Sequence, residues 1–344
     1  MSSREQDCLI GHESIEADLL SAWKKGRLPH SILLTGPKGV GRATLAFRLA
    51  KFLLSHPSSS SESLAVDSFS PVVRRILSGG HGDLQVIEPD PEKATKEITV
   101  DQARQIKSFL SQTPMEGGWR IVIVDGEMNG SAANAVLKVL EEPPKQSLLI
   151  LITESAGRVL PTIRSRCHMI KLKPLAQQQV LQILKREKPQ STDKELQVLA
   201  ALCDGRPGLA MEYDDVHAAS MYADLLEILG SLSRFNYGDA LAFSQKYSGK
   251  GKKDTALMDP FLVMGDCLKR FIQKLTRYAT LQDTDMTLPE EIPIFQSALS
   301  IRNAVAWAGI WENVNRDFQR AHRSHLDKSQ VLFCSLCEIA GVKV

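Results

Sequence analysis

The sequence RIVIVDGEMNGSAANAVLKVLEEPPKQSLLILIT, residues 120–153, contains two apolar runs separated by a helical pattern. The first run ends on Asp125, and the second covers residues 148–153. Runs of Leu and β-branched residues of this length are typical of strands buried on both faces of a parallel sheet. Residues 131–142 place their apolar side chains on one helical face, and two prolines then stop the helix. We therefore predict a strand, a helix and a second strand of an α/β domain.

Two motifs in this region and after it carry a resemblance to a known family. They are NAVLKVLEEPP, residues 134–144, and LPTIRSRC, residues 160–167. Together they resemble the clamp-loader branch of the AAA+ ATPases and, within it, the delta-prime family of bacterial DNA polymerase III subunits. The resemblance covers nearly all of the first half of the chain. It implies an α/β RecA-like AAA+ module with a small three-helix lid, followed by an all-α collar domain.

The resemblance also implies limits for these domains. We expect the RecA-like α/β domain at residues 1–173, the helical lid at residues 174–213 and the helical collar, an oligomerisation domain, at residues 214–344. The sequence agrees with the helical character of the last part, because apolar residues after about position 213 recur only at helical spacing.

A glycine-rich turn, GPKGVGRAT at residues 36–44, lies between an expected strand at residues 31–35 and an expected helix at residues 45–54. A strand, a glycine-rich turn and a helix form the setting in which backbone N–H groups bind phosphate. The candidate nucleotide-binding residues are Gly36, Gly39, Gly41, Arg42, Thr44 and Asp125.

The side chains of this turn depart from those of a working phosphate loop. Such a loop has a Lys that neutralises the β- and γ-phosphates, followed by a Ser or Thr that holds Mg²⁺. Here Arg42 and Ala43 stand at these positions, and Gly126 stands after Asp125 where a water-activating Glu is expected. Thr44 lies about 100° further round the helix than the metal-binding position. We expect no ATP hydrolysis: the turn either binds ATP or ADP weakly or keeps its shape only for packing.

Three arginines follow Thr153, which stands at the place of the polar sensor residue of AAA+ proteins. On their own, Arg158, Arg164 and Arg166 favour a solvated basic face. The resemblance implies a catalytic role for Arg166, because the arginine of Ser-Arg-Cys in clamp loaders reaches the ATP of the neighbouring subunit and stabilises charge on its γ-phosphate. An arginine finger supplied in trans accelerates hydrolysis by about 10³ to 10⁵ in well-measured systems.

Composition and cysteine usage bear on the partners and cofactors of the chain. The chain has 344 residues, 43 % of them hydrophobic, and a net charge of +2 that does not single out nucleic acid or a membrane as a direct partner. Its six cysteines are spread thinly over a long chain, which favours reduced thiols in a cytoplasm. None lies between Cys8 and Cys167, where many relatives carry a four-cysteine zinc module. We therefore expect no zinc and no membrane partner. A basic run at residues 249–253 fits either DNA phosphate contacts or a solvated loop.

These observations lead to one expected function and two alternatives. We expect an ATPase-deficient stator of the DNA polymerase III clamp loader that presents Arg166 to a gamma/tau-type subunit and also assembles with a delta-type subunit. The sliding clamp and primer-template DNA are then reached through the complex, in the nucleoid-associated replisome. No catalysis is expected from the chain alone, since polymerase activity belongs to the holoenzyme. The first alternative is an active gamma/tau-type ATPase in which Arg42 and Lys38 replace the lysine; the second is a AAA+ protein of recombination or helicase loading.

Overall fold

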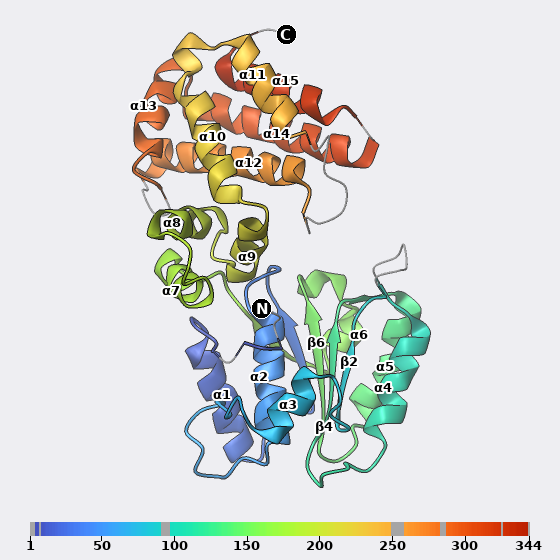
Figure 1. The fold of residues 1–344 in the computed structure, drawn as a ribbon. Helices are drawn as coiled ribbons and strands as arrows, with labels where there is room; N and C mark the ends of the chain where they lie inside the picture. The colour runs from blue at the N-terminus through green and yellow to red at the C-terminus, as the bar shows by residue number, and fades with distance from the viewer. Residues whose placement is uncertain are drawn as a thin grey trace. The chain divides into compact units, whose positions relative to one another are not determined.

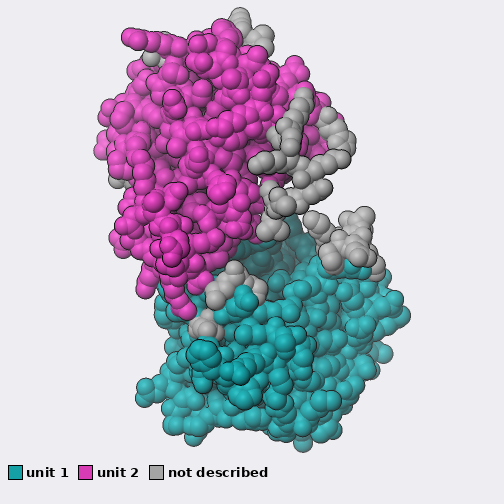
Figure 2. All heavy atoms as spheres, viewed as in Figure 1, with its two compact units in different colours: residues 1–176 teal, residues 177–344 magenta. Residues whose placement is uncertain are grey.

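The structure is a computed structural model that describes residues 4–6, 8–90, 97–248, 258–282, 287–324 and 326–342. The chain divides into two compact units, Met1–Ala176 and Gln177–Val344. Figure 1 colours the chain by residue number, and Figure 2 gives each unit its own colour. The basic run at residues 249–253 lies outside the described residues.

Unit 1 is built on a five-stranded parallel sheet with the strand order β2-β4-β6-β1-β7. Its strands are β1 (Ser31–Thr35), β2 (Leu84–Ile87), β4 (Arg120–Asp125), β6 (Ser147–Thr153) and β7 (His168–Lys171). Two shorter strands, β3 (Glu97–Ile98) and β5 (Glu127–Met128), pair in parallel as a separate two-stranded sheet. Because the order in the sheet differs from the order in the chain, helices cross over between parallel neighbours, as an α/β module requires.

Helices cover both faces of this sheet (Figure 1). They are α1 (Glu13–Lys24), α2 (Arg42–Leu54), α3 (Pro71–Leu77), α4 (Val100–Leu110), α5 (Gly130–Glu141) and α6 (Pro161–Arg164), with a 3₁₀ turn, η1 (Ala156–Arg158). Side chains alternate along each strand, so Ile121 and Ile123 pack in a core with α1, α2 and α3, while Val122 and Val124 pack in a second core with α4 and α5. This burial on both faces confirms the predicted strands.

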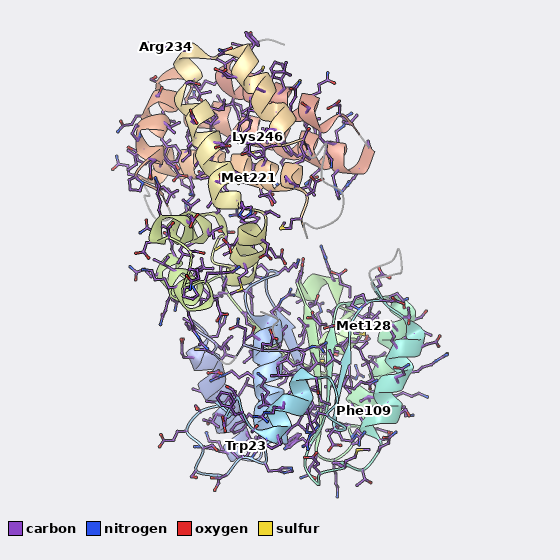
Figure 3. The ribbon with its side chains drawn as sticks, in the orientation of Figure 1. Trp23, Phe109, Met128, Met221, Arg234 and Lys246 are labelled. Carbon is purple, nitrogen blue, oxygen red and sulfur yellow. The ribbon has the colours of Figure 1, made fainter. Side chains whose placement is uncertain are left out.

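Polar and aromatic side chains fix the start of β4. Arg120, the first residue of this strand, is buried; its Nη1 lies 3.1 Å from Asp83 Oδ1 and also donates to the Thr113 carbonyl. Its guanidinium carbon lies 4.1 Å from the centre of the Phe109 ring on α4. Figure 3 labels Phe109. Nε of Arg120 has no hydrogen-bond partner in the described structure, and a buried ion pair of this kind is by itself weak evidence for stability.

Unit 2 contains helices and no strand among its described residues. The helices are α7 (Gln177–Glu187), α8 (Asp193–Leu202), α9 (Pro207–Asp215), α10 (Ala218–Gly230), α11 (Tyr237–Lys246), α12 (Pro260–Leu281), α13 (Glu291–Ile301), α14 (Ala304–Ser324) and α15 (Lys328–Ala340), with a 3₁₀ turn, η2 (Leu232–Arg234). The predicted fold class, a RecA-like AAA+ module followed by an all-α region, is confirmed. Helices α7 to α9 fall close to the expected lid, but the limits of lid and collar remain predictions.

The core of unit 2 contains large aromatic side chains and one buried ion pair. Trp307 is buried in this core, and the Phe261 and Phe318 rings stack with centroids 4.5 Å apart. Among these side chains Lys274 Nζ lies 3.0 Å from Glu291 Oε1, and neither residue is more than 9 % exposed.

Candidate functional site

The glycine-rich turn connects the end of β1 to the start of α2. Gly36, Gly39 and Gly41 have φ angles of +145°, +84° and +106°, a region that residues with a Cβ atom rarely adopt. At Gly36 a Cβ atom would also come 2.5 Å from the Leu172 carbonyl oxygen. The backbone of the turn therefore requires glycine at these positions.

The segment before α1 anchors this turn. The buried imidazole of His12 makes a hydrogen bond of 3.2 Å between Nε2 and the Val40 carbonyl oxygen. Leu9 is also buried, and its Cδ1 would lie 3.3 Å from a Cβ atom at Gly41. Burial is the main cause that lowers the pKa of His12, so the ring is neutral near pH 7. Sequence reasoning did not single out Leu9 or His12, because neither belongs to the glycine-rich motif.

The charge of Arg42, the first residue of α2, interacts with two carboxylates near the glycine-rich turn. Arg42 is only 8 % exposed; burial lowers its pKa, and Asp125 and Glu154 oppose this effect through their negative charges. Burial likewise raises the pKa of Asp125, and the charge of Arg42 counteracts that rise. The carboxylate that would bind Mg²⁺ in a working ATP site thus interacts with a cation of its own chain.

The position after Asp125 has no room for a side chain. Gly126 has a φ of +155°, and a Cβ atom there would come 2.7 Å from Cγ of Pro89. The next residue, Glu127, forms an ion pair with Arg158 at the surface. Its carboxylate is therefore paired with Arg158, and its place in the sequence is one residue after that of the missing glutamate.

Parallel pairing brings most of the candidate nucleotide-binding residues to one edge of the sheet. Thr35 is the register partner of Thr153, and Asp125 is the partner of Ile152, so the glycine-rich turn, Asp125 and Thr153 all lie at the carboxyl ends of the strands. Thr153 is buried, and its hydroxyl donates to the Ser155 carbonyl at 3.3 Å. Thr44 is half-buried in the first turn of α2. This edge corresponds in position to the nucleotide site of an ATPase. It lacks the phosphate-binding Lys, the metal-binding hydroxyl and the catalytic Glu.

Arg166 lies at the other edge of the sheet. It follows α6 and precedes β7, and its carbonyl accepts a hydrogen bond of 2.8 Å from the hydroxyl of Ser31, the first residue of β1. The glycine-rich turn follows the last residue of the same strand, Thr35. Five residues in a strand span about 13 Å, so the backbone of Arg166 is separated from the turn by the length of β1. Arg166 is therefore not a part of its own chain's glycine-rich site.

The side chain of Arg166 is bound to its own chain at the surface. Nη2 lies 2.9 Å from Oε1 of Glu141, and Nη1 donates to the Thr162 carbonyl at 3.0 Å. Cys167 is half-buried instead, and burial raises the pKa of its thiol to about 11, so it is protonated at neutral pH. Sequence reasoning missed Glu141 as a partner, although this residue belongs to the motif at residues 134–144.

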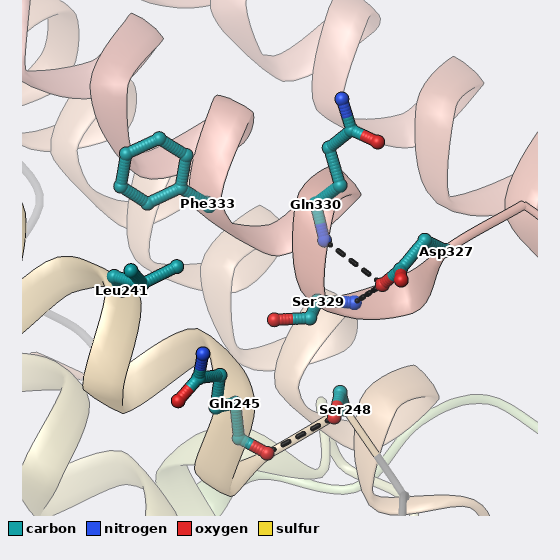
Figure 4. A pocket seen from close by; sticks show the side chains of 7 residues that line it. All are labelled: Leu241, Gln245, Ser248, Asp327, Ser329, Gln330 and Phe333. Carbon is teal, nitrogen blue, oxygen red and sulfur yellow. Dashed lines mark hydrogen bonds between the residues drawn. The ribbon is translucent and has the colours of Figure 1, made fainter.

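Residues outside the glycine-rich turn line several cavities of the described structure. One, of about 370 Å³, opens beside the carboxyl edge of the sheet and is lined by Gly126, Glu127, Thr153, Arg158 and apolar residues that include Leu160 and Ile163. Another, of about 550 Å³, lies between α11 and α15 in unit 2 and is drawn in Figure 4. Its lining includes Leu241 and Phe333 on one side and Gln245 and Ser248 on the other.

The described ranges contain neither an evident metal centre nor a membrane-spanning helix. No group of three or more His, Cys, Asp or Glu side chains within these ranges is arranged to hold a metal ion. In the same ranges no helix combines the length and the apolar character that crossing a bilayer demands. The expectation of no zinc remains a prediction.

Part of the chain is similar in sequence to known DNA polymerase III subunits. Residues 11–176 match the family described as "DNA polymerase III, delta subunit". The chain is 36 % identical over 180 residues to the DNA polymerase III subunit delta' of Pseudomonas aeruginosa, which covers 52 % of this chain and 53 % of that protein. It is 33 % identical over 168 residues to the DNA polymerase III subunit gamma/tau of Mycobacterium bovis, covering 46 % and 27 %. The chain thus spans about half the length of the curated delta' relative.

A solved structure was also found to be similar. It is a DNA polymerase III gamma subunit-related protein from Thermotoga maritima, with a TM-score of 0.43 and 20 % sequence identity. The similarity covers 94 % of this chain and 99 % of that one.

Proposed function

We propose, from the match of residues 11–176 to the DNA polymerase III delta family, that the chain is a delta-prime-type subunit of a clamp loader. Its role is that of an ATPase-deficient stator. It holds its place in the assembly and supplies Arg166 as an arginine finger to the ATP bound by a neighbouring gamma/tau-type subunit. The ATP cycle of that neighbour then drives the loading of a sliding clamp on primer-template DNA.

The position of Arg166 relative to the glycine-rich turn is the main support for this proposal. Arg166 and the glycine-rich turn lie at opposite edges of one sheet, at the two ends of β1. A guanidinium at a surface of the module, 38 % exposed, is available to a nucleotide held by another chain but not to one held by its own turn. Arginine stabilises charge on a transferred γ-phosphoryl group because its planar fork matches phosphate oxygens.

The glycine-rich site supports the other half of the proposal. Arg42, Ala43 and Gly126 remove the phosphate lysine, the metal hydroxyl and the water-activating carboxylate. Each loss is expected to slow hydrolysis by orders of magnitude. The turn keeps at most a weak affinity for ATP or ADP, and the chain needs neither a nucleotide nor zinc of its own.

Partners and location follow from the same proposal. The chain assembles with gamma/tau-type and delta-type subunits, and reaches the sliding clamp and DNA through the complex. It works in the cytoplasm as a part of the nucleoid-associated replisome, with no membrane partner.

A reconstituted complex tests whether the site of this chain is silent. The variant Asp125→Ala/Arg42→Ala should leave the DNA- and clamp-stimulated ATPase rate of the complex unchanged, because no step of the reaction uses that site. A large loss of turnover in this variant, with the complex still assembled, would show that the glycine-rich site works and that the stator proposal is wrong.

The similarity to a gamma/tau subunit favours a second candidate, an active clamp-loader ATPase. In that case Arg42 and the exposed Lys38 would together take over the role of the lysine. Hydrolysis of ATP by the isolated chain, abolished by Asp125→Ala, would support this candidate. We expect no such hydrolysis.

A further inference from the structure

The two motifs of unit 1 at residues 134–144 and 160–167 are joined by an ion pair. Glu141 comes from the first motif and Arg166 from the second, with 2.9 Å between Oε1 and Nη2. The other terminal nitrogen, Nη1, donates to the Thr162 carbonyl at 3.0 Å. Both ends of the guanidinium fork are therefore bonded to acceptors of its own chain.

The position of Glu141 favours this pairing. Glu141 is the last residue of α5, where the free carbonyl groups of the helix carry partial negative charge. A carboxylate at this end of a helix is unfavourable by itself, and a cation is favourable. The guanidinium of Arg166 compensates both the carboxylate and the helix end, so the pair is the stable arrangement in the isolated chain.

The pair is nevertheless easy to break. The side chains of Arg166 and Glu141 are 38 % and 49 % exposed, and ion pairs with this exposure change an equilibrium by no more than about fivefold. A phosphate oxygen is an equally good or better acceptor for the same fork, because charge-assisted bidentate bonds to phosphate are among the strong ones. A neighbour's nucleotide can thus displace the carboxylate.

We propose that Glu141 is a positioning residue that restrains Arg166 until a phosphate group of a neighbouring subunit's nucleotide replaces it. This inference rests on the proposed function, since it assigns a regulation to the arginine finger. The carboxylate and the phosphate compete for Nη2, so Glu141 keeps the finger withdrawn when the neighbour is not correctly placed. No covalent bond changes in this exchange.

Chemical modification of the isolated full-length chain tests the restraint directly. Phenylglyoxal reacts with arginine guanidinium groups, and mass spectrometry of the peptides gives the rate at Arg166. Glu141→Gln should raise this rate about two- to fivefold, because the neutral amide no longer holds the guanidinium. The matched control is Glu142→Gln, which removes the exposed carboxylate next in the chain and should leave the rate unchanged. Equal rates in Glu141→Gln and the wild type would overturn the inference.

The ATPase rate of the reconstituted complex tests the consequence. Without clamp and DNA, Glu141→Gln should raise turnover about two- to fivefold, Glu141→Asp should raise it less because the charge is kept, and Glu142→Gln should not change it. If Arg166→Ala has no effect on turnover, the proposed function itself fails, and the modification experiment still decides whether Glu141 holds Arg166. If Arg166→Ala and Glu141→Gln both lower turnover, Glu141 supports catalysis and does not restrain the finger.

Discussion

Pro89 lies so close to Gly126 that a Cβ atom on Gly126 would come 2.7 Å from its Cγ and 2.8 Å from its Cδ. The φ of Gly126, +155°, is a second obstacle, because residues with a side chain rarely adopt it. A steric and a conformational barrier therefore both exclude a glutamate at the position where hydrolysis would need one. The contact with Pro89 and the backbone conformation both exclude a side chain here, so a substitution at Gly126 alone cannot restore the carboxylate.

We predict that Gly126→Glu destabilises unit 1 and does not create ATPase activity. The clash with Pro89 and the strained φ should lower the free energy of unfolding by about 1–3 kcal/mol, as for other overpacked or strained sites. Urea unfolding measures this change, and a phosphate-release assay measures hydrolysis. Gly130→Ala is the matched control, since a Cβ atom there meets nothing within 4 Å, and should change stability by no more than about 0.5 kcal/mol. A Gly126→Glu variant as stable as the wild type would contradict this explanation.

The buried imidazole of His12 predicts a loss of stability in mild acid. Its pKa in the folded chain lies below the ordinary value of 6.5, mainly because of burial, so the unfolded chain binds more protons below that pH. The free energy of unfolding should therefore fall as the pH drops from 7 through 6.5 and towards the lowered pKa. Denaturant unfolding at a series of pH values tests this, and His12→Gln should flatten the dependence.

His81 requires a separate control, because burial also lowers its pKa. The sign of its contribution is the same, so His81→Asn should remove a further share of the pH dependence. The two shares should add, since the side chains have no partner in common in the described structure. A slope that stays unchanged in the His12 variant would mean that this ring keeps its ordinary pKa.

The ion pair between Lys274 and Glu291 predicts a strong dependence of unit 2 on both partners. Glu291 also accepts hydrogen bonds from the Tyr222 hydroxyl and from the backbone N–H of Leu288. Glu291→Leu leaves the buried ammonium of Lys274 without its partner and should lower the free energy of unfolding by about 3–5 kcal/mol. Thermal or urea unfolding of the full chain measures the loss.

The double variant Lys274→Met/Glu291→Leu provides the control for this prediction. It removes both charges, so it should recover most of the stability that Glu291→Leu loses, apart from the bonds to Tyr222 and Leu288. If the double variant is less stable than Glu291→Leu alone, the unpaired lysine is not the main cause of the loss.

Much of unit 1 could be predicted from sequence because its strands are long, apolar and buried on both faces. The runs ending on Thr35, Asp125 and Thr153 needed no tertiary information to be recognised as strands. The short helix α3 was missed, although Ser70 caps it and Pro71 begins it, because seven residues carry too little periodicity to be recognised.

The candidate site was less predictable than the fold. The motif located Gly126, but its contact with Pro89 joins two separate parts of the chain and has no signal in either. Helical spacing could only place Glu141 away from the apolar face of its helix; the partner of its side chain depends on where α6 ends. Packing of His12 against the glycine-rich turn depends in the same way on tertiary structure.

The central claim, that Arg166 acts on the nucleotide of a neighbour, is tested most directly by the steady-state ATPase of the reconstituted complex with clamp and DNA present. Arg166→Ala should lower kcat by at least about tenfold with little change in KM, because the finger stabilises charge that develops in the transition state. The matched control is Arg164→Ala, which removes an exposed arginine two residues earlier and should leave kcat unchanged. An assembled complex that keeps its full kcat with Arg166→Ala would contradict the account.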